Sequence, residues 1–201
     1  MQELTRGDRV GGRYVLVRRL GAGTHGETWL ADDADGRRRV ALKLPLASSP
    51  PDAARREAEL LQRFTHPAVA AVHGVAELDD GRAALVQEYL SGGDLASLRG
   101  RPWQQVLPAL RPVLDALVAL ADAGLAHVDF KPANLVRDED GRAKLVDFGV
   151  AVLAHAPGAP TGSPYSRSPA QWRGAVPTPA DDAYGLGALL FELLAGHPPY
   201  Y

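Results

Sequence analysis

One short stretch of the chain constrains its function more than any other. Residues 127–134 read His-Val-Asp-Phe-Lys-Pro-Ala-Asn, and an Asp-Phe-Gly tripeptide follows. Asp129 can accept a hydroxyl proton, and Lys131 can neutralise a phosphoryl oxygen. Asn134 and Asp147 carry the hard oxygen ligands that Mg²⁺ prefers. The pattern therefore indicates chemistry on a phosphoryl group.

This stretch closely resembles the catalytic loop and metal loop of Hanks-type protein kinases, the eukaryotic-like serine/threonine kinases of bacteria. In that family too, an asparagine follows the aspartate by five residues and a second aspartate follows it by 18. The resemblance implies a two-lobed α+β fold. Residues 1–90 would form an N-lobe of antiparallel sheet plus one helix. Residues 91–201 would form a mainly helical C-lobe, shortened after its central helix.

A glycine-rich motif lies upstream, at Gly21, Gly23 and Gly26. Dinucleotide-binding folds also use such a motif, but there a helix begins at the glycines. Here a second strand-like segment follows, and Lys43 comes 17 residues after Gly26. This arrangement resembles the phosphate-covering hairpin of kinases. For the motif alone, an ordinary glycine-rich hairpin remains the alternative.

The resemblance also assigns residues to ATP. Lys43 would bind the α- and β-phosphates and pair with a glutamate of the following helix. Glu57 and Glu59 are both available, and they point about 200° apart, so at most one faces inward; we favour Glu57. The residues implied to bind the nucleotide are Leu20, Gly21, Gly23, Gly26, Thr28, Ala41, Lys43, Glu57, Glu88, Leu90 and Val136.

The segment 85–95 resembles the kinase hinge, because an apolar strand there ends in a glycine-rich turn. The carbonyl of Glu88 and the amide of Leu90 would then contact adenine. Gln87 stands where an apolar residue is more common in the family. An ordinary exit from strand to loop is the alternative for this segment.

One helix is expected before this hinge and one after it. Residues 51–64 form the first, with Ser49 as its N-cap. Residues 102–124 form the second, on the spacing of their apolar side chains. Because proline inside a helix costs about 3 kcal/mol, Pro108 and Pro112 predict a late start or a kink. Short strands are expected at 40–44, 69–77, 83–88, 135–136 and 144–146.

Residues 150–179 are rich in Pro, Gly, Ala and Ser, which predicts a mobile or extended loop. In the family this is the activation segment, and the hydroxyl of Ser163 would bond near the catalytic aspartate and lysine. Many kinases have an arginine where this chain has Val128, and that arginine binds a phosphate on the segment. We therefore expect activity without phosphorylation of the segment. The candidate phosphorylation sites are Thr161, Ser166 and Ser168.

A third helix is expected at 181–194, resembling the central helix of the C-lobe, where Asp182 would anchor the catalytic-loop backbone. Its leucines point in several directions, and a helix that is apolar on most sides must be buried. Ala170 replaces the glutamate that usually ends the activation segment. We therefore expect a homodimer, or a partner protein, to cover the shortened C-lobe.

Composition narrows the partners and the location. The net charge of −2 implies no basic face for nucleic acid. The absence of cysteine excludes disulfides and thiolate metal sites and fits a reducing compartment. No apolar run reaches the roughly 18–20 residues of a membrane span. We expect a cytoplasmic protein.

Together these features predict an ATP-dependent serine/threonine protein kinase that transfers the γ-phosphoryl group of MgATP to a protein hydroxyl. The catalytic residues would be Asp129, Lys131 and Lys43, and the ligands of Mg²⁺, or of Mn²⁺ in its place, would be Asn134 and Asp147. Two alternatives are an ATP-binding pseudokinase that acts as a scaffold and a small-metabolite kinase of related fold. Ala170 favours the scaffold, whereas the intact catalytic set opposes it.

Overall fold

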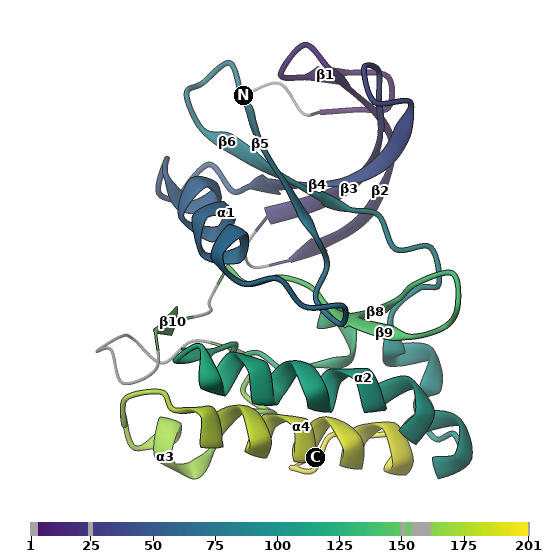
Figure 1. The fold of residues 1–201 in the computed structure, drawn as a ribbon, viewed down its shortest axis with the longest axis vertical. Helices are drawn as coiled ribbons and strands as arrows, with labels where there is room; N and C mark the ends of the chain where they lie inside the picture. The colour runs from purple at the N-terminus through teal and green to yellow at the C-terminus, as the bar shows by residue number, and fades with distance from the viewer. Residues whose placement is uncertain (1–3, 24–25, 150–151, 154–161, 201) are drawn as a thin grey trace. The chain divides into compact units, whose positions relative to one another are not determined.

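The computed structural model describes residues 4–23, 26–149, 152–153 and 162–200, with the backbone only for residues 63, 152 and 153. The chain forms two compact units. The first contains the described residues up to Thr65 together with Ala70–Tyr89, and the second contains His66–Val69 and the described residues from Leu90 onward. Figure 1 shows that strands dominate the first unit and helices the second.

The first unit is a six-stranded sheet with one helix against it, in the strand order β1-β2-β3-β4-β6-β5. All of its neighbouring strands are antiparallel. The helix lies against β5 and β6 (Figure 1). The elements are β1 (Arg9–Val10), β2 (Tyr14–Gly23), β3 (Gly26–Asp33), β4 (Arg38–Pro45), α1 (Ala53–Arg63), β5 (Val72–Glu77) and β6 (Ala83–Glu88).

The two faces of this sheet bury separate apolar clusters, because successive side chains of a strand point to opposite faces. Ala84 and Val86 of β6 belong to the larger cluster, and Ala83 and Leu85 belong to the smaller one beneath α1. The other members of the larger cluster are Val10, Tyr14, Leu16, Trp29, Ala31, Val40, Leu42, Leu44 and Ala76. The sheet therefore has a core on each side.

Helix α1 begins later than expected. Its N-cap is Asp52 rather than Ser49, and no side chain caps it. Ser49 precedes two consecutive prolines, and Pro50, as the residue before Pro51, is disfavoured in the helical conformation that the first position after an N-cap needs. The first helical hydrogen bond instead runs from the amide of Arg56 to the carbonyl of Asp52, at 2.9 Å.

Strand β5 also begins later than expected, at Val72 rather than Val69. Val69 instead forms an isolated parallel bridge with Leu145 of the second unit, to which both residues belong. The amide of Leu145 donates to the carbonyl of Ala68 at 2.8 Å. Pairing with Leu145, which is distant in the sequence, therefore keeps Ala68 and Val69 out of β5.

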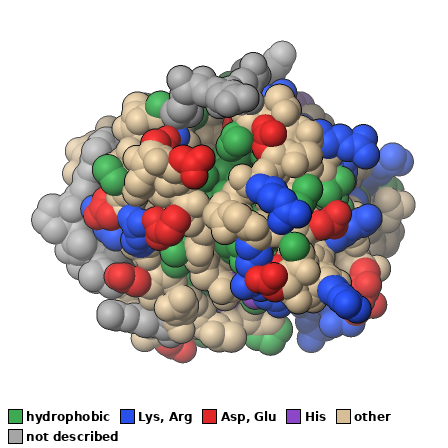
Figure 2. All heavy atoms as spheres, turned by 90° about the horizontal axis from the view of Figure 1, so that it is seen from above, with side chains coloured by type: hydrophobic (Ala, Val, Ile, Leu, Met, Phe, Trp, Pro, Cys, Tyr) green, Lys and Arg blue, Asp and Glu red, His purple; other side chains and the backbone are tan. Residues whose placement is uncertain are grey.

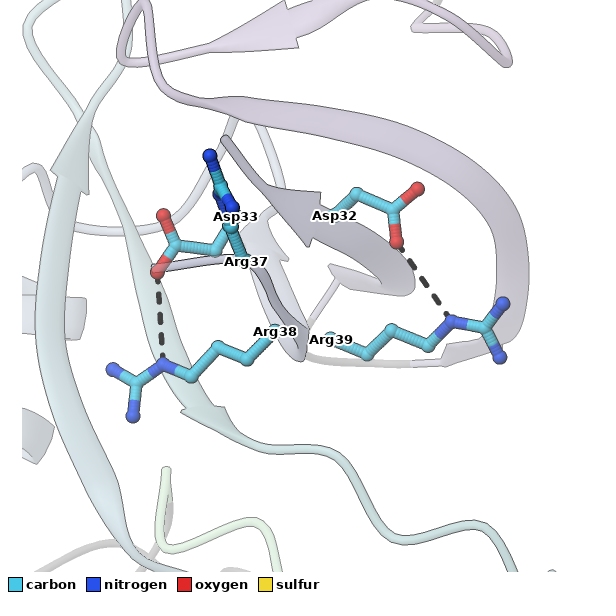
Figure 3. Close-up of a pocket in the computed structure, with 5 residues that line it drawn as sticks. All are labelled: Asp32, Asp33, Arg37, Arg38 and Arg39. Atoms are coloured by element: carbon cyan, nitrogen blue, oxygen red, sulfur yellow. Dashed lines mark ion pairs between the residues drawn. The ribbon is translucent and has the colours of Figure 1, made fainter. Parts of the chain in front are cut away.

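A network of charges fixes the turn between β3 and β4 (Figure 3). The buried carboxylate of Asp33 accepts hydrogen bonds from Nε and Nη2 of Arg13, at 2.6 and 2.8 Å. Arg38 and Arg39 point in opposite directions, toward Asp33 at 3.6 Å and Asp32 at 3.7 Å. A pocket at this turn contains none of the predicted site residues. It is lined by Asp32, Asp33, Arg37, Arg38 and Arg39.

The second unit is built around two helices that pack side by side, α2 (Trp103–Asp122) and α4 (Pro179–Ala195) (Figure 1). Its smaller elements are η1 (Leu95–Leu98), β7 (Leu125–Ala126), η2 (Pro132–Asn134), β8 (Leu135–Arg137), β9 (Ala143–Leu145), β10 (Val152–Leu153) and α3 (Pro169–Trp172). The expected loop at 150–179 therefore contains a short strand and a helical turn. β10 pairs with β7, and Ser168 caps α3 through a capping box.

Helix α2 contradicts the expected late start, because it begins at Trp103 and continues through Pro108 and Pro112. Each proline removes one donor, so the carbonyls of Gln104 and Pro108 lose their helical partners. Both Gln104 and Pro108 are exposed, so water can satisfy these carbonyls. Gly124 follows the helix in the left-handed region, with φ of 68°.

The surface mixes charges of both signs. On the face drawn in Figure 2, lysine and arginine side chains are interspersed with aspartate and glutamate rather than gathered into one basic area. Among the described helices, none has both the length and the apolar character that crossing a bilayer requires.

Candidate active site

The backbone of the candidate catalytic loop, residues 127–134, is anchored by the carboxylate of Asp182 on α4. This carboxylate is 1% exposed and accepts the amide N–H groups of His127 and Val128, at 2.8 and 2.7 Å. Burial raises the pKa of the Asp182 carboxyl. The two amide donors and the nearby His127 favour the charged carboxylate and oppose this rise. Val128 has a φ of 57°, an unusual conformation for a β-branched residue. The anchoring role expected for Asp182 is confirmed.

Asp129 collects donors from three parts of the second unit. Its Oδ2 accepts Nζ of Lys131 at 2.6 Å and Nδ2 of Asn134 at 2.8 Å. Its Oδ1 accepts the backbone N–H of Ser163 at 2.6 Å. The carboxylate is 1% exposed, so these donors fix its orientation. The structure assigns the contact of Ser163 to its amide, whereas the sequence comparison pointed to its hydroxyl.

The hairpin of β8 and β9 places the two candidate metal ligands at one end. The amide of Val146 donates to the carbonyl of Asn134 at 2.9 Å, and Asp147 follows directly. Asn134 uses its amide nitrogen for hydrogen bonds to Asp129, which leaves the amide oxygen as its ligand atom. Asp147 has a φ of 63° and accepts the amide of Gly149 at 3.3 Å.

His127 packs against this end of the hairpin. Its ring lies 5.2 Å from the ring of Phe130 and 4.7 Å from that of Phe148, centroid to centroid. Its Nε2 lies 3.2 Å from the carbonyl oxygen of Val146. His127 is fully buried, so its role is to support the two loops rather than to exchange protons with a substrate.

In the first unit, Lys43 of β4 pairs with Glu57 of α1. The distances from Nζ to the two carboxylate oxygens are 2.9 and 2.8 Å. The two side chains are only 11% and 7% exposed, whereas Glu59 points to solvent. The rotation of a helix therefore separates the two candidate glutamates, and Glu57 is the one that faces the sheet.

The glycine-rich motif forms the hairpin of β2 and β3, in which Gly23 stands opposite Gly26. Gly26 has a φ of 128°, and a Cβ built on it would lie 1.9 Å from the carbonyl oxygen of Leu44. No other residue type fits there without a backbone shift. Thr24 and His25, between these glycines, lie outside the described residues.

The register of the sheet aligns further predicted residues with Lys43. Thr28 lies directly opposite Lys43, and Gly21 lies opposite Thr28. Ala41 is two residues before Lys43 and therefore shares its face of the sheet. Leu20 is 37% exposed and Ala41 5% exposed.

The remaining predicted contacts flank the end of β6. In the first unit, the amide of Glu88 donates to the carbonyl of Ala71 at 2.8 Å, so the strand end is fixed. In the second unit, Leu90 is buried, and Val136 of β8 forms a bridge with Asp94.

Sequence reasoning did not find the role of Asp181. This carboxylate is 6% exposed, and it bonds both the hydroxyl of Ser168 at the start of α3 and the amide of Thr178 at the start of α4. It thus joins the N-termini of two helices. A capping pattern of Thr178 and Asp181 was readable in the sequence, but the contact with Ser168 joins residues 13 apart and depends on the fold.

Comparison with known proteins identifies the family of this chain. Residues 14–201 match the protein kinase domain family. The chain is 36% identical over 203 residues to the serine/threonine-protein kinase PknL of Mycobacterium bovis, covering 94% of this chain and 50% of that protein. It is 31% identical over 210 residues to the serine/threonine-protein kinase PrkC of Bacillus subtilis, covering 96% of this chain and 32% of that protein. The chain thus spans between about a third and a half of the length of these two curated relatives.

The fold agrees as well. A solved crystal structure of a kinase domain superimposes with a TM-score of 0.88 at 20% sequence identity, covering 99% of this chain and 69% of that one. This likeness confirms the expected α+β fold, and the sequence match covers nearly all of the same residues. The chain belongs to the protein kinase family, and it is similar to the serine/threonine kinases of bacteria.

Proposed function

We propose that this chain is an ATP-dependent serine/threonine protein kinase, which transfers the γ-phosphoryl group of ATP to a protein hydroxyl. In this proposal residues 1–90 act as the nucleotide-binding lobe and residues 91–201 as the catalytic lobe. The observation that carries it is the set of hydrogen bonds on Asp129, because a scaffold has no need for a carboxylate oriented by a lysine and an asparagine.

Each catalytic residue has a role that follows from its contacts. Asp129 would accept the proton of the substrate hydroxyl, since its carboxylate is fixed in place. Lys131 would neutralise the transferred group, and its side chain is one third exposed and can reach a ligand. Lys43, oriented by Glu57, would bind phosphate oxygens.

Mg²⁺ fits the donor set of the second unit. Asn134 and Asp147 supply an amide oxygen and a carboxylate, and Mg²⁺ is commonly held by one or two such groups together with substrate phosphates. Within the described residues no cluster of three or more His, Cys, Asp or Glu forms a complete cage, which fits a metal that arrives with the nucleotide. When bound, the ion would offset the negative charge of the phosphates.

For the nucleotide, we propose the predicted contacts in each unit. In the first unit these are Leu20, the glycines of the β2–β3 hairpin, Thr28, Ala41 and the carbonyl of Glu88. In the second unit they are Leu90 and Val136. Their support is the register of β2, β3 and β4, which places Thr28 and Ala41 on the same face of the sheet as Lys43.

The test is phosphoryl transfer from labelled MgATP to a generic acceptor protein. Lys43→Met and Asp147→Ala should abolish transfer without unfolding the chain, because both residues serve phosphates or metal rather than the core. Lys144→Met is the matched control, since Lys144 lies on β9 and has no proposed role. Wild-type turnover in Lys43→Met or Asp147→Ala would contradict the role of that residue.

The same assay separates the alternatives. A pseudokinase would bind ATP but transfer nothing, and a small-metabolite kinase would leave every protein acceptor unlabelled while consuming ATP with a metabolite. Ala170 remains the observation that favours the scaffold, because the family usually has glutamate there.

We also propose that another polypeptide surface, a second copy or a different protein, covers α4. Its exposed positions carry no charge, and apart from the terminal Ala195 they are three or four residues apart: Ala180, Ala183, Gly187, Phe191 and Leu194. Phe191 is 44% exposed and Leu194 40%. A contiguous apolar strip of this kind usually marks an interface. Light scattering across micromolar concentrations tests the proposal, and a monodisperse monomer that binds no hydrophobic dye would contradict it.

For the location, we propose the cytoplasm, where ATP is available to a kinase. The cysteine-free sequence is compatible with a reducing compartment. Cell fractionation with an antibody to this domain tests the proposal, and recovery of the domain outside the cytoplasm would contradict it.

A further inference from the structure

Arg167 is a partly buried cation that lacks an acidic partner among the described residues. Its Nη2 donates to the carbonyl of Gly162 at 3.1 Å. Its guanidinium lies over the ring of Trp172, 4.6 Å from the centroid. Its Nε is buried and makes no hydrogen bond to any of the described residues. The guanidinium of Arg167 is therefore held in place, but no carboxylate of the described residues pairs with it.

The position of this cation relates it directly to Asp129. Gly162, which Arg167 binds, precedes Ser163, and the amide of Ser163 donates to Asp129 at 2.6 Å. Gly162 also lies tight against the catalytic loop, because a Cβ built on it would come within 2.1 Å of the carbonyl oxygen of Val128. Arg167 is thus tied to the segment that contacts the proposed catalytic base.

The chemistry of the guanidinium defines what would bind there. A carboxylate, like a phosphate, is a strong partner because it can accept two parallel N–H groups. Removing a guanidinium from water without such a partner is unfavourable. Trp172, whose side chain is 59% exposed, holds the plane of the guanidinium through a cation–π contact and reduces the entropy lost on binding a carboxylate.

We propose that Arg167 selects protein substrates that carry an acidic side chain close to the acceptor serine or threonine. This inference rests on the proposed kinase activity and adds a substrate class to it. The acceptor hydroxyl must reach Asp129, and Arg167 is fixed to the adjoining segment. The selected acid should therefore lie within a few residues of the acceptor.

The test is a set of peptides with one acceptor serine and one glutamate, which is moved through the three positions on each side. Each peptide has a matched version with glutamine in place of glutamate. The full 201-residue chain is treated with phosphatase first, so that no phosphate of its own can occupy Arg167. At one or two positions we expect glutamate to raise kcat/KM about tenfold over glutamine, the usual effect of one charge-assisted hydrogen bond.

Three variants identify the residue responsible. Arg167→Gln keeps an amide donor for Gly162 but removes the charge, so kcat/KM should become nearly equal for the glutamate and glutamine peptides. Arg167→Glu should reverse the preference, toward a peptide with lysine at the same position. Arg173→Gln is the matched control, because Arg173 lies in the same segment, is exposed, and its side chain makes no hydrogen bond or ion pair with the described residues. It should keep the wild-type preference.

Each result bears on a different claim. A wild-type enzyme that phosphorylates glutamate and glutamine peptides equally at every position would overturn the substrate preference and leave the kinase activity standing. Equal loss on both peptides in Arg167→Gln would leave the preference in place and assign Arg167 a purely structural role, which would overturn the proposal that Arg167 selects the acid. Absence of transfer to every peptide and to the generic acceptor would overturn the proposed function itself, and the inference with it.

Discussion

Asp129 shows how the proposed chemistry depends on single atoms. Both carboxylate oxygens accept hydrogen bonds, from Lys131 and Asn134 on one side and from the amide of Ser163 on the other. We predict that Asp129→Asn slows transfer about 10²–10⁴-fold, because an amide cannot accept the substrate proton. The affinity for ATP should stay nearly unchanged, since the proposed base contacts the acceptor. Turnover and nucleotide titration measure the two effects, and a large loss of ATP affinity would contradict the assignment.

Asp33 gives a residue-scale prediction about acid stability. The hydrogen bonds from Arg13 hold the pKa of the Asp33 carboxyl well below its ordinary value of 3.8. In the unfolded chain this carboxyl has the ordinary pKa of 3.8. The ionised Asp33 therefore stabilises the fold fully above that pH, and this stabilisation is lost as the pH falls from 3.8 toward the lower pKa of the folded protein. Denaturant unfolding from about pH 6 to about pH 3 should show a smaller loss of stability in Arg13→Gln than in wild type.

The matched control for Arg13 is Arg39→Gln. Arg39 and Asp32 are 3.7 Å apart, and both side chains are more than half exposed, so the pair is screened by solvent. This variant should keep the acid sensitivity of the wild type. An equal change in both variants would show that general surface charge, rather than the buried carboxylate of Asp33, causes the effect.

At the scale of an element, the β2–β3 hairpin depends on one glycine. Gly26→Ala should destabilise the first unit by roughly 1–3 kcal/mol, because a positive φ is unfavourable for alanine and its Cβ would meet the carbonyl of Leu44. Gly21→Ala is the control, since a Cβ there meets no atom within 4 Å. Thermal unfolding compares them, and equal melting temperatures would rule out the steric argument.

The segment that follows Asp147 gives a second prediction at this scale. Val128 cannot bind a phosphate, so treatment with phosphatase should leave turnover within about twofold of its starting value. Of the candidate sites, Thr161 lies outside the described residues, whereas Ser166 and Ser168 are 6% and 5% exposed and so poorly accessible to modification. Mass spectrometry should confirm removal of any phosphate, and a tenfold or greater loss of turnover would contradict the prediction.

Alanine substitution tests this segment less cleanly. Ser168 caps α3 and bonds Asp181, so Ser168→Ala should cost about 0.5–2 kcal/mol whether or not the residue is ever phosphorylated. Thr161→Ala combined with phosphatase treatment separates the regulatory question from this capping effect.

At the scale of the whole molecule, the apolar strip of α4 is the feature that bears on assembly. Phe191→Arg should lower the concentration-dependent mass in light scattering, because a charge there must be desolvated when the strip is covered. Val118→Arg on α2 is the control, as Val118 is also apolar and is 63% exposed. Equal effects of the two variants would show that general surface hydrophobicity, rather than this strip, drives association.

The local parts of the fold were predictable because their causes are local. Asp129, Lys131 and Asn134 lie within six consecutive residues, so their types and spacing predicted a phosphoryl-transfer site before any fold was known. The family match then confirmed the fold class that these motifs implied.

Predictions of element boundaries were less reliable. Ser49 looked like a helix cap, but two prolines moved the helix start to Asp52. Pro108 and Pro112 looked like breakers, but α2 packs against α4 and continues through both. Propensity is a weak preference of a few kcal/mol at most, and the burial of a helix face can exceed it.

The sequence alone determined which chemical groups the chain carries and how far apart they lie along it. Only the tertiary structure decided that Glu57 faces Lys43, that the amide of Ser163 reaches Asp129, and that Arg167 lacks an acidic partner among the described residues. The first two contacts join residues that are 14 and 34 positions apart in the sequence. The third depends on which carboxylates the fold keeps away from Arg167 within the described residues. Packing of the whole unit decides which groups meet, and residue types and spacing do not encode that packing in any one stretch of the chain.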